Sequence, residues 1–259
     1  MTGNKEYTAG KLKVKIYNSR EALGKEAARE AATAIKELLG QKNEVNIIFA
    51  AAPSQNEFLS ALTADKDIPW GRINAFHMDE YINLDPEAPQ GFGNFLKQRL
   101  FEKVKFKSVH YLNGNAEVVE AECQRYTRLL QEYPADVVCM GIGENGHIAF
   151  NDPHVAYFDD KHLVKVVSLD LKCRIQQVND GCFGSLDEVP ASAITLTIPA
   201  LIAANRIFCM VPGRTKAEAV YRTVFGDVAE TCPASILRKH ENAILYIDKD
   251  SGSLVADLI

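Results

Sequence analysis

Residues 135–153 read ADVVCMGIGENGHIAFNDP, an apolar run followed by a glycine-rich stretch with several polar side chains. The run at 135–140 is apolar enough to form a buried strand, as in a parallel sheet that helices cover on both faces. In such sheets ligands bind beyond the carboxyl ends of the strands. Since the glycine-rich stretch begins where this strand ends, it indicates both the fold class and the place of a functional site.

The rest of the chain alternates in the same way between short apolar runs and longer amphipathic segments. Asn18, with Glu21 three residues later, is a typical start of the first helix. The alternation predicts an α/β three-layer sandwich, with a Rossmann-like, mainly parallel sheet and helices on both faces. The predicted strands are 45–51, 73–78, 109–112, 135–141, 163–169, 193–198, 206–211 and 243–247, and the predicted helices are 18–40, 55–65, 91–104, 117–133 and 214–225.

Length and composition exclude several classes of protein. The 259 residues include 47% hydrophobic and 24% charged residues, which is ordinary for a globular protein, and no repeat or linker divides them, so residues 1–259 are predicted to form a single domain. A net charge of −5 without a basic patch argues against a nucleic-acid partner. The first ten residues lack a signal-peptide core, and no apolar stretch approaches the ~20 residues that span a membrane.

The cysteines indicate the compartment. Six are scattered along the chain without a C-x-x-C pair, and several lie in apolar runs, where cysteine behaves as a small buried hydrophobe. We therefore expect a reduced, cytoplasmic protein without a structural metal or disulfide.

The glycine-rich stretch fits G-x-G-x-x-G, the pattern of a dinucleotide-binding turn. That turn requires a helix beginning within the glycines, because the helix N-terminus holds the pyrophosphate. Here the residues after Gly146 show no amphipathic repeat and include a turn at 151–153, so we reject a nucleotide cofactor. Instead, Gly141, Gly143 and Gly146 would let the backbone approach a ligand closely or adopt positive φ.

Polar side chains accompany those glycines. Asn145, His147, Asn151 and Asp152 would face the ligand, and a hydrogen bond between His147 and Asp152 would fix the imidazole tautomer and tune its basicity. The alternative is a glycine-rich turn whose histidine is satisfied by backbone groups. The density of polar groups at a strand end favours a functional site.

A second loop carries adjacent carboxylates at the end of another apolar strand. In FHMDEYINLDP, residues 76–86, Asp79 and Glu80 follow the strand and are flanked by Met78 and Tyr81. A partly desolvated carboxylate has a raised pKa, as a proton-abstracting base needs. A helix N-cap or a solvated turn explains these residues about as well.

FHMDEYINLD, YLNGNA and GIGENGHIAFNDP together closely resemble the glucosamine-6-phosphate deaminase (isomerase) family, a relative of the 6-phosphogluconolactonases, over about residues 18–248. The resemblance implies a Rossmann-like sandwich and an enzyme of amino-sugar metabolism that uses neither metal nor cofactor. Such enzymes open the sugar ring, move a proton from C2 to C1 and release ammonia to give fructose 6-phosphate. The implied partner is a small sugar phosphate, without nucleic acid or membrane, and a homo-oligomer is left open.

The resemblance implies roles for individual residues. Asp79 is similar to the base that shuttles the C2 proton, and His147 to the acid/base of ring opening. Asp152 stands where the family has a glutamate that supports the histidine. Asn145 stands where many members have an aspartate. We therefore expect these four to be catalytic.

Substrate-binding residues are expected in the same loops. Lys216, in GRTK, matches a lysine that binds the substrate phosphate, and Ser54, in AAPSQ, matches the hydroxyl of the family's T-G-G-T-P phosphate loop. Gly143 and Gly146 would bring backbone to the sugar, and Glu80 would line the site beside the base.

Phosphate recognition departs from the family pattern. AAPSQ lacks both glycines of the phosphate loop, and the arginine of the family's A-N-S-R-F-F motif has no counterpart in QQVNDGCFG, residues 176–184. Two alternatives to a deaminase therefore stay open. One is a 6-phosphogluconolactonase-type hydrolase in which His147 activates water, and the other is a non-catalytic sugar-phosphate-binding protein.

Overall fold

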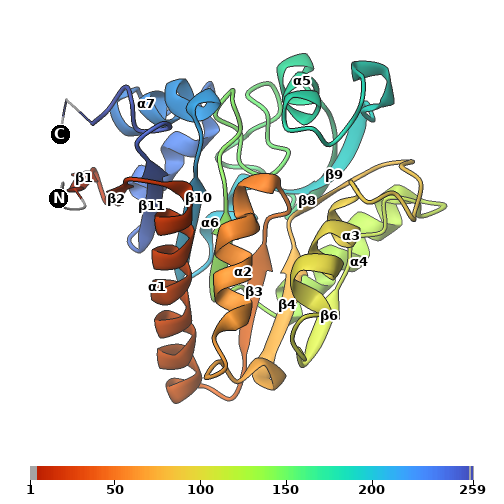
Figure 1. Ribbon diagram of the computed structural model, residues 1–259. Helices are drawn as coiled ribbons and strands as arrows, with labels where there is room; N and C mark the ends of the chain where they lie inside the picture. The colour runs from red at the N-terminus through yellow and green to blue at the C-terminus, as the bar shows by residue number, and fades with distance from the viewer. Residues whose placement is uncertain (1–4, 257, 259) are drawn as a thin grey trace.

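The computed structural model describes residues 5–256 and 258, and an eight-stranded sheet forms its centre (Figure 1). Every neighbouring pair in this sheet is parallel except the first, which is an antiparallel hairpin at one edge. In order across the sheet the strands are β1 (Lys5–Ala9), β2 (Leu12–Tyr17), β11 (Ala243–Asp248), β10 (Arg206–Val211), β7 (Val137–Met140), β3 (Val45–Phe49), β4 (Ile73–His77) and β6 (Ser108–His110).

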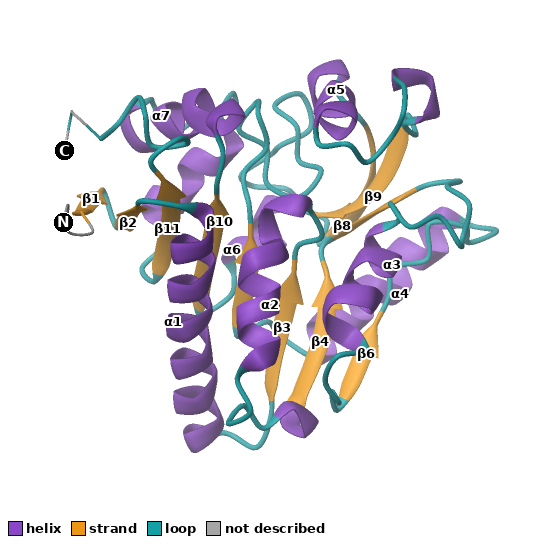
Figure 2. Ribbon diagram, in the orientation of Figure 1, coloured by secondary structure: helices purple, strands orange, loops and turns teal. Residues whose placement is uncertain are grey.

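Helices cover both faces of this sheet, which confirms the predicted three-layer α/β architecture (Figure 2). In β3, Ile48 belongs to one buried cluster while Ile47 and Phe49 belong to the other, so both faces of the strand are packed. This explains why the strand sequences are apolar at successive positions. One face carries α1 (Arg20–Gln41), α2 (Asn56–Ala64) and α3 (Phe92–Leu96), and the other carries α4 (Val119–Glu132), α6 (Ile198–Ile202) and α7 (Ala217–Phe225).

The first helix begins one residue later than a cap at Asn18 predicts. Ser19 is the N-cap, and its Oγ accepts a hydrogen bond from the backbone N–H of Ala22 at 3.2 Å. The prediction of Asn18 as the cap was therefore wrong, because the next residue carries an equally suitable hydroxyl.

A second, smaller sheet was not predicted. The segments at 163–169 and 193–198 are strands, as expected, but they lie outside the parallel sheet. They pair antiparallel with each other, and the second also pairs antiparallel with a short strand that follows β4. These strands are β5 (Asp79–Tyr81), β9 (Ser192–Leu196) and β8 (Val164–Ser168), in that order. Because only Met78 separates β4 from β5, Asp79 lies at the junction of the two sheets.

Several short elements complete the structure. The sequence did not predict the β1–β2 hairpin, α6 or α5 (Leu171–Asn179). Short helical turns lie at Pro53–Gln55 (η1), Trp70–Arg72 (η2), Lys97–Phe101 (η3), Leu186–Glu188 (η4), Arg214–Lys216 (η5) and Pro233–Lys239 (η6).

Two findings bear on the surroundings of the protein. Within residues 5–256, no helix combines the length and the apolar character that crossing a bilayer demands. All six cysteines are free thiols.

Candidate active site

Four loops meet at the carboxyl ends of adjacent strands, where they enclose a cavity of about 170 Å³. The strands are β10, β7, β3 and β4, and the direction of the chain across the sheet reverses between β3 and β7. Such a reversal point is where open α/β sheets bind ligands. The predicted residues that line this cavity are Ser54, Asp79, Gly141, Gly143, His147 and Lys216, whereas Asn145, Asn151 and Asp152, which were expected to face the ligand, do not line it.

The glycine-rich loop lacks the geometry of a dinucleotide site. No helix occurs in residues 147–163, so no helix N-terminus is available within the glycines for a pyrophosphate. The cavity is also smaller than the roughly 300–1,000 Å³ of pockets for drug-sized ligands. The first observation argues against a pyrophosphate at this loop, and the second favours a small ligand.

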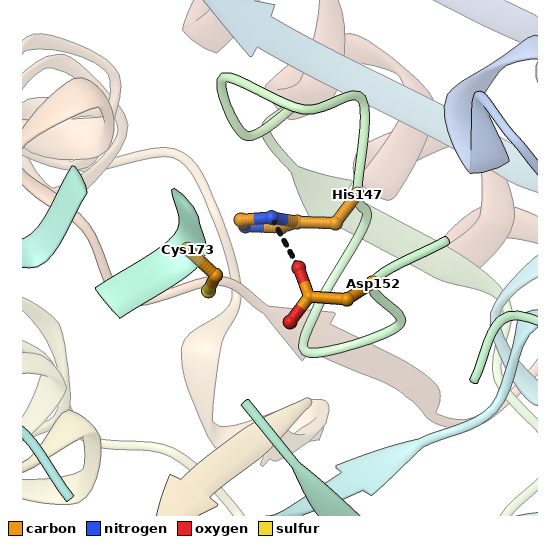
Figure 3. Close-up of side chains that lie close together, drawn as sticks. All are labelled: His147, Asp152 and Cys173. Carbon is orange, nitrogen blue, oxygen red and sulfur yellow. Dashed lines mark ion pairs between the residues drawn. The ribbon is translucent and has the colours of Figure 1, made fainter. Parts of the chain in front are cut away.

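His147 is held by two polar side chains from its own loop. Its Nδ1 lies 2.8 Å from Oδ1 of Asn145 and 3.1 Å from Oδ1 of Asp152, and the Asn145 amide donates to the same Asp152 oxygen at 2.8 Å (Figure 3). The contact between His147 and Asp152 expected from the sequence is therefore present as a close approach of Nδ1 to the carboxylate, while the hydrogen bond of Nδ1 is to Asn145. With Nδ1 engaged, Nε2 is the ring nitrogen available to a ligand.

The charge on Asp152 is maintained despite its burial. Desolvation favours the protonated form, yet hydrogen bonds from His147, from Asn145 and from the backbone N–H of Asp170 outweigh it and hold the pKa of Asp152 below its ordinary value. A fixed carboxylate thus faces the imidazole and stabilises its protonated form during proton transfer.

Gly143 and Gly146, the two glycines expected to bind substrate, have different structural roles. A Cβ at Gly143 would overlap the imidazole ring of His147, so only glycine lets the ring lie against the backbone here. Gly146 has φ +90°, a Cβ there would be 2.9 Å from Sγ of Cys232, and it does not line the cavity. Gly143 therefore shapes the site directly, whereas Gly146 shapes the turn behind it.

Cys173 of α5 completes a cluster with His147 and Asp152, in which one potential ligand atom from each lies within 4.8 Å of the others (Figure 3). The oxygens of Asp152 already accept several N–H groups. Burial, together with nearby carboxylates, raises the pKa of the Cys173 thiol well above its ordinary value and keeps it neutral. This cluster therefore fits a hydrogen-bonded acid/base centre better than a metal site.

Asp79 presents a buried carboxylate to the cavity. Its side chain is 6% exposed, and no hydrogen bond to its carboxylate occurs among the described residues. Burial raises the pKa of Asp79 well above its ordinary value, and the neighbouring Glu80 adds to the rise. A desolvated, unpartnered carboxylate is what a proton-abstracting base requires.

His77 fixes the backbone that carries this carboxylate. Its Nδ1 lies 2.9 Å from the carbonyl oxygen of Asp79, and its Nε2 accepts the N–H of Leu112 at 2.9 Å. This geometry requires a neutral ring with the proton on Nδ1, and burial lowers the pKa of His77 to about 4. Sequence reasoning did not identify this residue.

Glu80 points away from the cavity. Its carboxylate accepts the backbone N–H groups of Tyr81 at 2.9 Å, Phe92 at 3.0 Å and Gly93 at 2.8 Å, at the beginning of α3. The structure therefore does not bring Glu80 to the residues with which it was expected to bind substrate. Its contacts match the alternative role for these carboxylates, satisfying a helix N-terminus.

Lys216 and Ser54 line the cavity from the loops after β10 and β3. Lys216 is 5% exposed, and its ammonium has neither an ion pair nor a hydrogen bond among residues 5–256. Burial lowers the pKa of Lys216, although the carboxylates of Asp180 and Glu144 oppose the shift. Ser54 Oγ accepts a hydrogen bond from the Gln55 amide at 3.1 Å, so its own proton is free for a ligand. An unpaired ammonium and a free hydroxyl in one cavity suit an anion.

Other lining residues come from distant parts of the sequence. Arg20 begins α1, and Gln176, Gln177 and Asp180 come from α5 and its end. Gln176 also accepts the N–H of Glu144 at 2.7 Å, which ties α5 to the glycine-rich loop. Gln176, Gln177 and Asp180 lie in the segment 176–184, which stood out in the sequence only for its missing arginine, and no sequence signal pointed to Arg20.

Comparison with known proteins gives consistent similarities. Residues 18–246 match the family described as "Glucosamine-6-phosphate isomerases/6-phosphogluconolactonase". The chain is 34% identical to a glucosamine-6-phosphate deaminase of Lactobacillus delbrueckii subsp. bulgaricus over 94% of this chain and 100% of that one. It is 35% identical to the deaminase of Streptococcus sanguinis over 89% of this chain and 95% of that one.

Solved structures extend the similarity to the fold. A monomeric glucosamine-6-phosphate deaminase superposes with a TM-score of 0.84 at 31% identity, covering 93% of this chain and 99% of that chain. A 6-phosphogluconolactonase from Thermotoga maritima superposes with a TM-score of 0.74 at 20% identity, covering 91% and 99%. The second similarity concerns the fold alone.

Proposed function

The chain belongs to the family of glucosamine-6-phosphate isomerases and 6-phosphogluconolactonases, and we propose on that basis that it converts glucosamine 6-phosphate and water to fructose 6-phosphate and ammonia. The observation that carries this proposal is the free, buried carboxylate of Asp79 in the same cavity as His147 and Lys216. A hydrolase that only activates water has no need of a second, unpartnered base. Relatives at 34–35% identity over most of their length support the deaminase rather than the lactonase.

In the proposed reaction His147 acts first. Its Nε2 accepts the proton of the C1 hydroxyl and returns a proton to the ring oxygen as the C1–O5 bond breaks, leaving an open-chain aldehyde. Asp152 and Asn145, which hold Nδ1, keep the ring oriented and stabilise its charged form.

Asp79 then moves the proton between carbons. Its carboxylate removes the C2 hydrogen, the electron pair forms a C1–C2 double bond, and the aldehyde oxygen takes up a proton. Return of the proton from Asp79 to C1 gives a protonated C2 imine, which water hydrolyses to the ketone and ammonia released as the ammonium ion. Lys216 and Ser54 would hold the phosphate throughout, so that C2 stays close to the base.

An assay of ammonia release tests this proposal. Purified protein is supplied with glucosamine 6-phosphate, with unphosphorylated glucosamine and, separately, with 6-phosphogluconolactone. We expect equal amounts of ammonia and fructose 6-phosphate from the first substrate only. Lactone hydrolysis without ammonia release would instead identify the hydrolase, and ligand binding without either reaction would identify the non-catalytic binding protein.

Three further expectations belong to this proposal. Residues 1–259 act as a single domain, which is supported by the contribution of both sheets to one cavity through Asp79. A cytoplasmic location is supported by six free thiols. A homo-oligomer stays a prediction, and the similar deaminase structure is described as monomeric, so sedimentation of the purified chain decides between the two states.

A further inference from the structure

A phosphate group needs more positive charge than Lys216 supplies. A phosphate monoester carries about −1.5 to −2 charges near pH 7. Among the described residues that line the cavity, Arg20 and Lys216 are the lysines and arginines, while Asp180 adds a carboxylate near the ammonium. The QQVNDGCFG segment supplies no arginine. Any second cation for the phosphate must therefore come from Arg20.

Arg20 lies against the segment that carries Ser54. Its Nη2 donates to the carbonyl oxygen of Pro53 at 3.0 Å, and Pro53 is the first residue of η1. The side chain thus reaches from the beginning of α1 to the loop after β3, although the two are more than thirty residues apart along the chain. This contact places the guanidinium beside the proposed phosphate loop.

Glu57 orients the guanidinium. Nη2 of Arg20 donates a hydrogen bond to Oε2 of Glu57 at 3.0 Å, and Nε lies 2.8 Å from Oε1 without donating to it, so an ion pair with Glu57 holds the guanidinium. The two helices approach closely here, since a Cβ at Gly24 of α1 would be 2.6 Å from Cβ of Glu57. Among the described residues, Nη1 has no hydrogen-bond partner, so both of its N–H groups are available on a side chain already held in place.

We propose that Arg20 is a second phosphate-binding residue, which donates from Nη1 to the phosphate of the sugar while Lys216 and Ser54 bind its other oxygens. This inference rests on the proposed function and names the residue that completes its phosphate site. An arginine from the first helix would then bind the phosphate in place of the arginine that residues 176–184 lack.

Steady-state kinetics of Arg20→Met test the proposal, because methionine keeps much of the apolar stem and removes the charge. Arg20 is 40% exposed, so water weakens its hydrogen bonds, and we expect KM for glucosamine 6-phosphate to rise about tenfold with kcat unchanged. The inhibition constant of inorganic phosphate should rise by the same factor. Arg20→Lys should give an intermediate value, because it keeps the charge and loses the fork.

Arg206→Met is the matched control. Arg206 is 38% exposed and pairs with Glu37 at 3.0 Å, much as Arg20 pairs with Glu57, but it lies outside the cavity. We expect this variant to behave as the parent protein. Equal changes in both variants would overturn the proposal, because they would reflect the net charge of the molecule.

A double variant removes the remaining ambiguity. In Arg20→Met alone, Glu57 loses its partner, and its free charge could repel phosphate. The rise in KM and in the phosphate inhibition constant must therefore persist in Arg20→Met/Glu57→Gln. Return of either constant to the parent value would overturn the assignment of Arg20.

The proposed reaction can fail independently of this inference. The increase in the thermal unfolding temperature that inorganic phosphate causes on binding can be measured without any substrate. If the parent protein releases no ammonia but phosphate protects it, and Arg20→Met loses that protection, the proposed function fails while Arg20 stands. If the parent protein is active, and Arg20→Met changes neither KM nor the protection by phosphate, the proposed function stands while the assignment of Arg20 fails.

Discussion

Replacing Asp79 by asparagine should stabilise the fold while abolishing catalysis. The carboxylate is buried, makes no hydrogen bond among the described residues, and has a pKa raised by desolvation. Asparagine has the same shape and never carries the charge. The variant therefore removes the cost of a buried anion without removing a contact.

The pH dependence follows from the direction of this shift. The folded-state pKa of Asp79 lies above its unfolded value of about 3.9, so the folded protein binds this proton more tightly. The stabilisation that results is complete below the unfolded pKa and is lost as the pH rises through the folded pKa. Between those two values the advantage of Asp79→Asn should grow by about 1.4 kcal/mol per pH unit, and above the folded pKa it should stay constant.

Urea unfolding of both proteins from pH 4.5 to pH 8 measures this difference. The pH at which the difference stops growing gives the folded-state pKa of Asp79. A difference in unfolding free energy that stays constant over the whole range would refute the reasoning, because it would mean that water solvates the carboxylate.

Asp136→Asn provides a contrasting control. Asp136 is also buried, at 3% exposure, but its carboxylate accepts the N–H of Asn46 at 2.9 Å and pairs with Lys42 at 2.7 Å. This variant loses contacts and should destabilise the protein. Burial alone therefore does not determine the sign of the effect.

The catalytic half of the prediction uses the same variant. General bases contribute about 10²–10⁴-fold to rate, so Asp79→Asn should slow ammonia release at least a hundredfold. Exchange of the C2 hydrogen with deuterated water should stop, while inorganic phosphate binds as in the parent. Exchange at the parent rate would show that another group is the base.

Three shorter predictions concern the rest of the site. Lys216→Met should raise KM for glucosamine 6-phosphate tenfold or more, since it removes a buried ammonium from the anion site; an unchanged KM would remove Lys216 from that site. Asn145→Asp adds a carboxylate 2.8 Å from Nδ1 of His147, and this negative charge favours the imidazolium. The limb of the kcat–pH profile that belongs to the histidine should therefore move to higher pH. Identical profiles for the two proteins would contradict the contact between residue 145 and His147. His77→Phe removes the hydrogen-bond partners of the Asp79 carbonyl and the Leu112 N–H, so kcat should fall about tenfold or more while KM stays unchanged. His77→Gln should restore part of the lost kcat. A kcat equal to that of the parent in His77→Phe would exclude a positioning role.

The parts of the fold and site that the sequence predicted are encoded locally. Apolar residues at successive positions, as in β3, identify strands covered on both faces. The contact between His147 and Asp152 spans five residues of one loop, so spacing and residue type were enough to anticipate it. The rule that ligands bind at the carboxyl ends of strands then located the cavity.

The parts that the sequence did not predict depend on contacts between distant segments. In β5, only three residues pair, and their partners in β9 lie more than a hundred positions away in the sequence. The sequence around Asp79 therefore contains no local signal for the second sheet. Arg20 reaches the cavity only because α1 packs against α2 at Gly24. A glutamate at position 80 fits either of two roles, contact with a ligand or capping of a helix N-terminus. Only the structure shows that it has the second role.

The close approach of Gly143 to His147 also constrains how the gene can change. Every missense substitution reachable by one base change from a glycine codon introduces a Cβ, and any Cβ at this position overlaps the imidazole ring. Gly40 and Gly71 differ, since a Cβ there meets nothing within 4 Å. Position 143 should therefore be as intolerant of mutation as the histidine itself, although its residue has no side chain to react. A protein that keeps the His147 ring in this position must therefore also keep glycine at position 143.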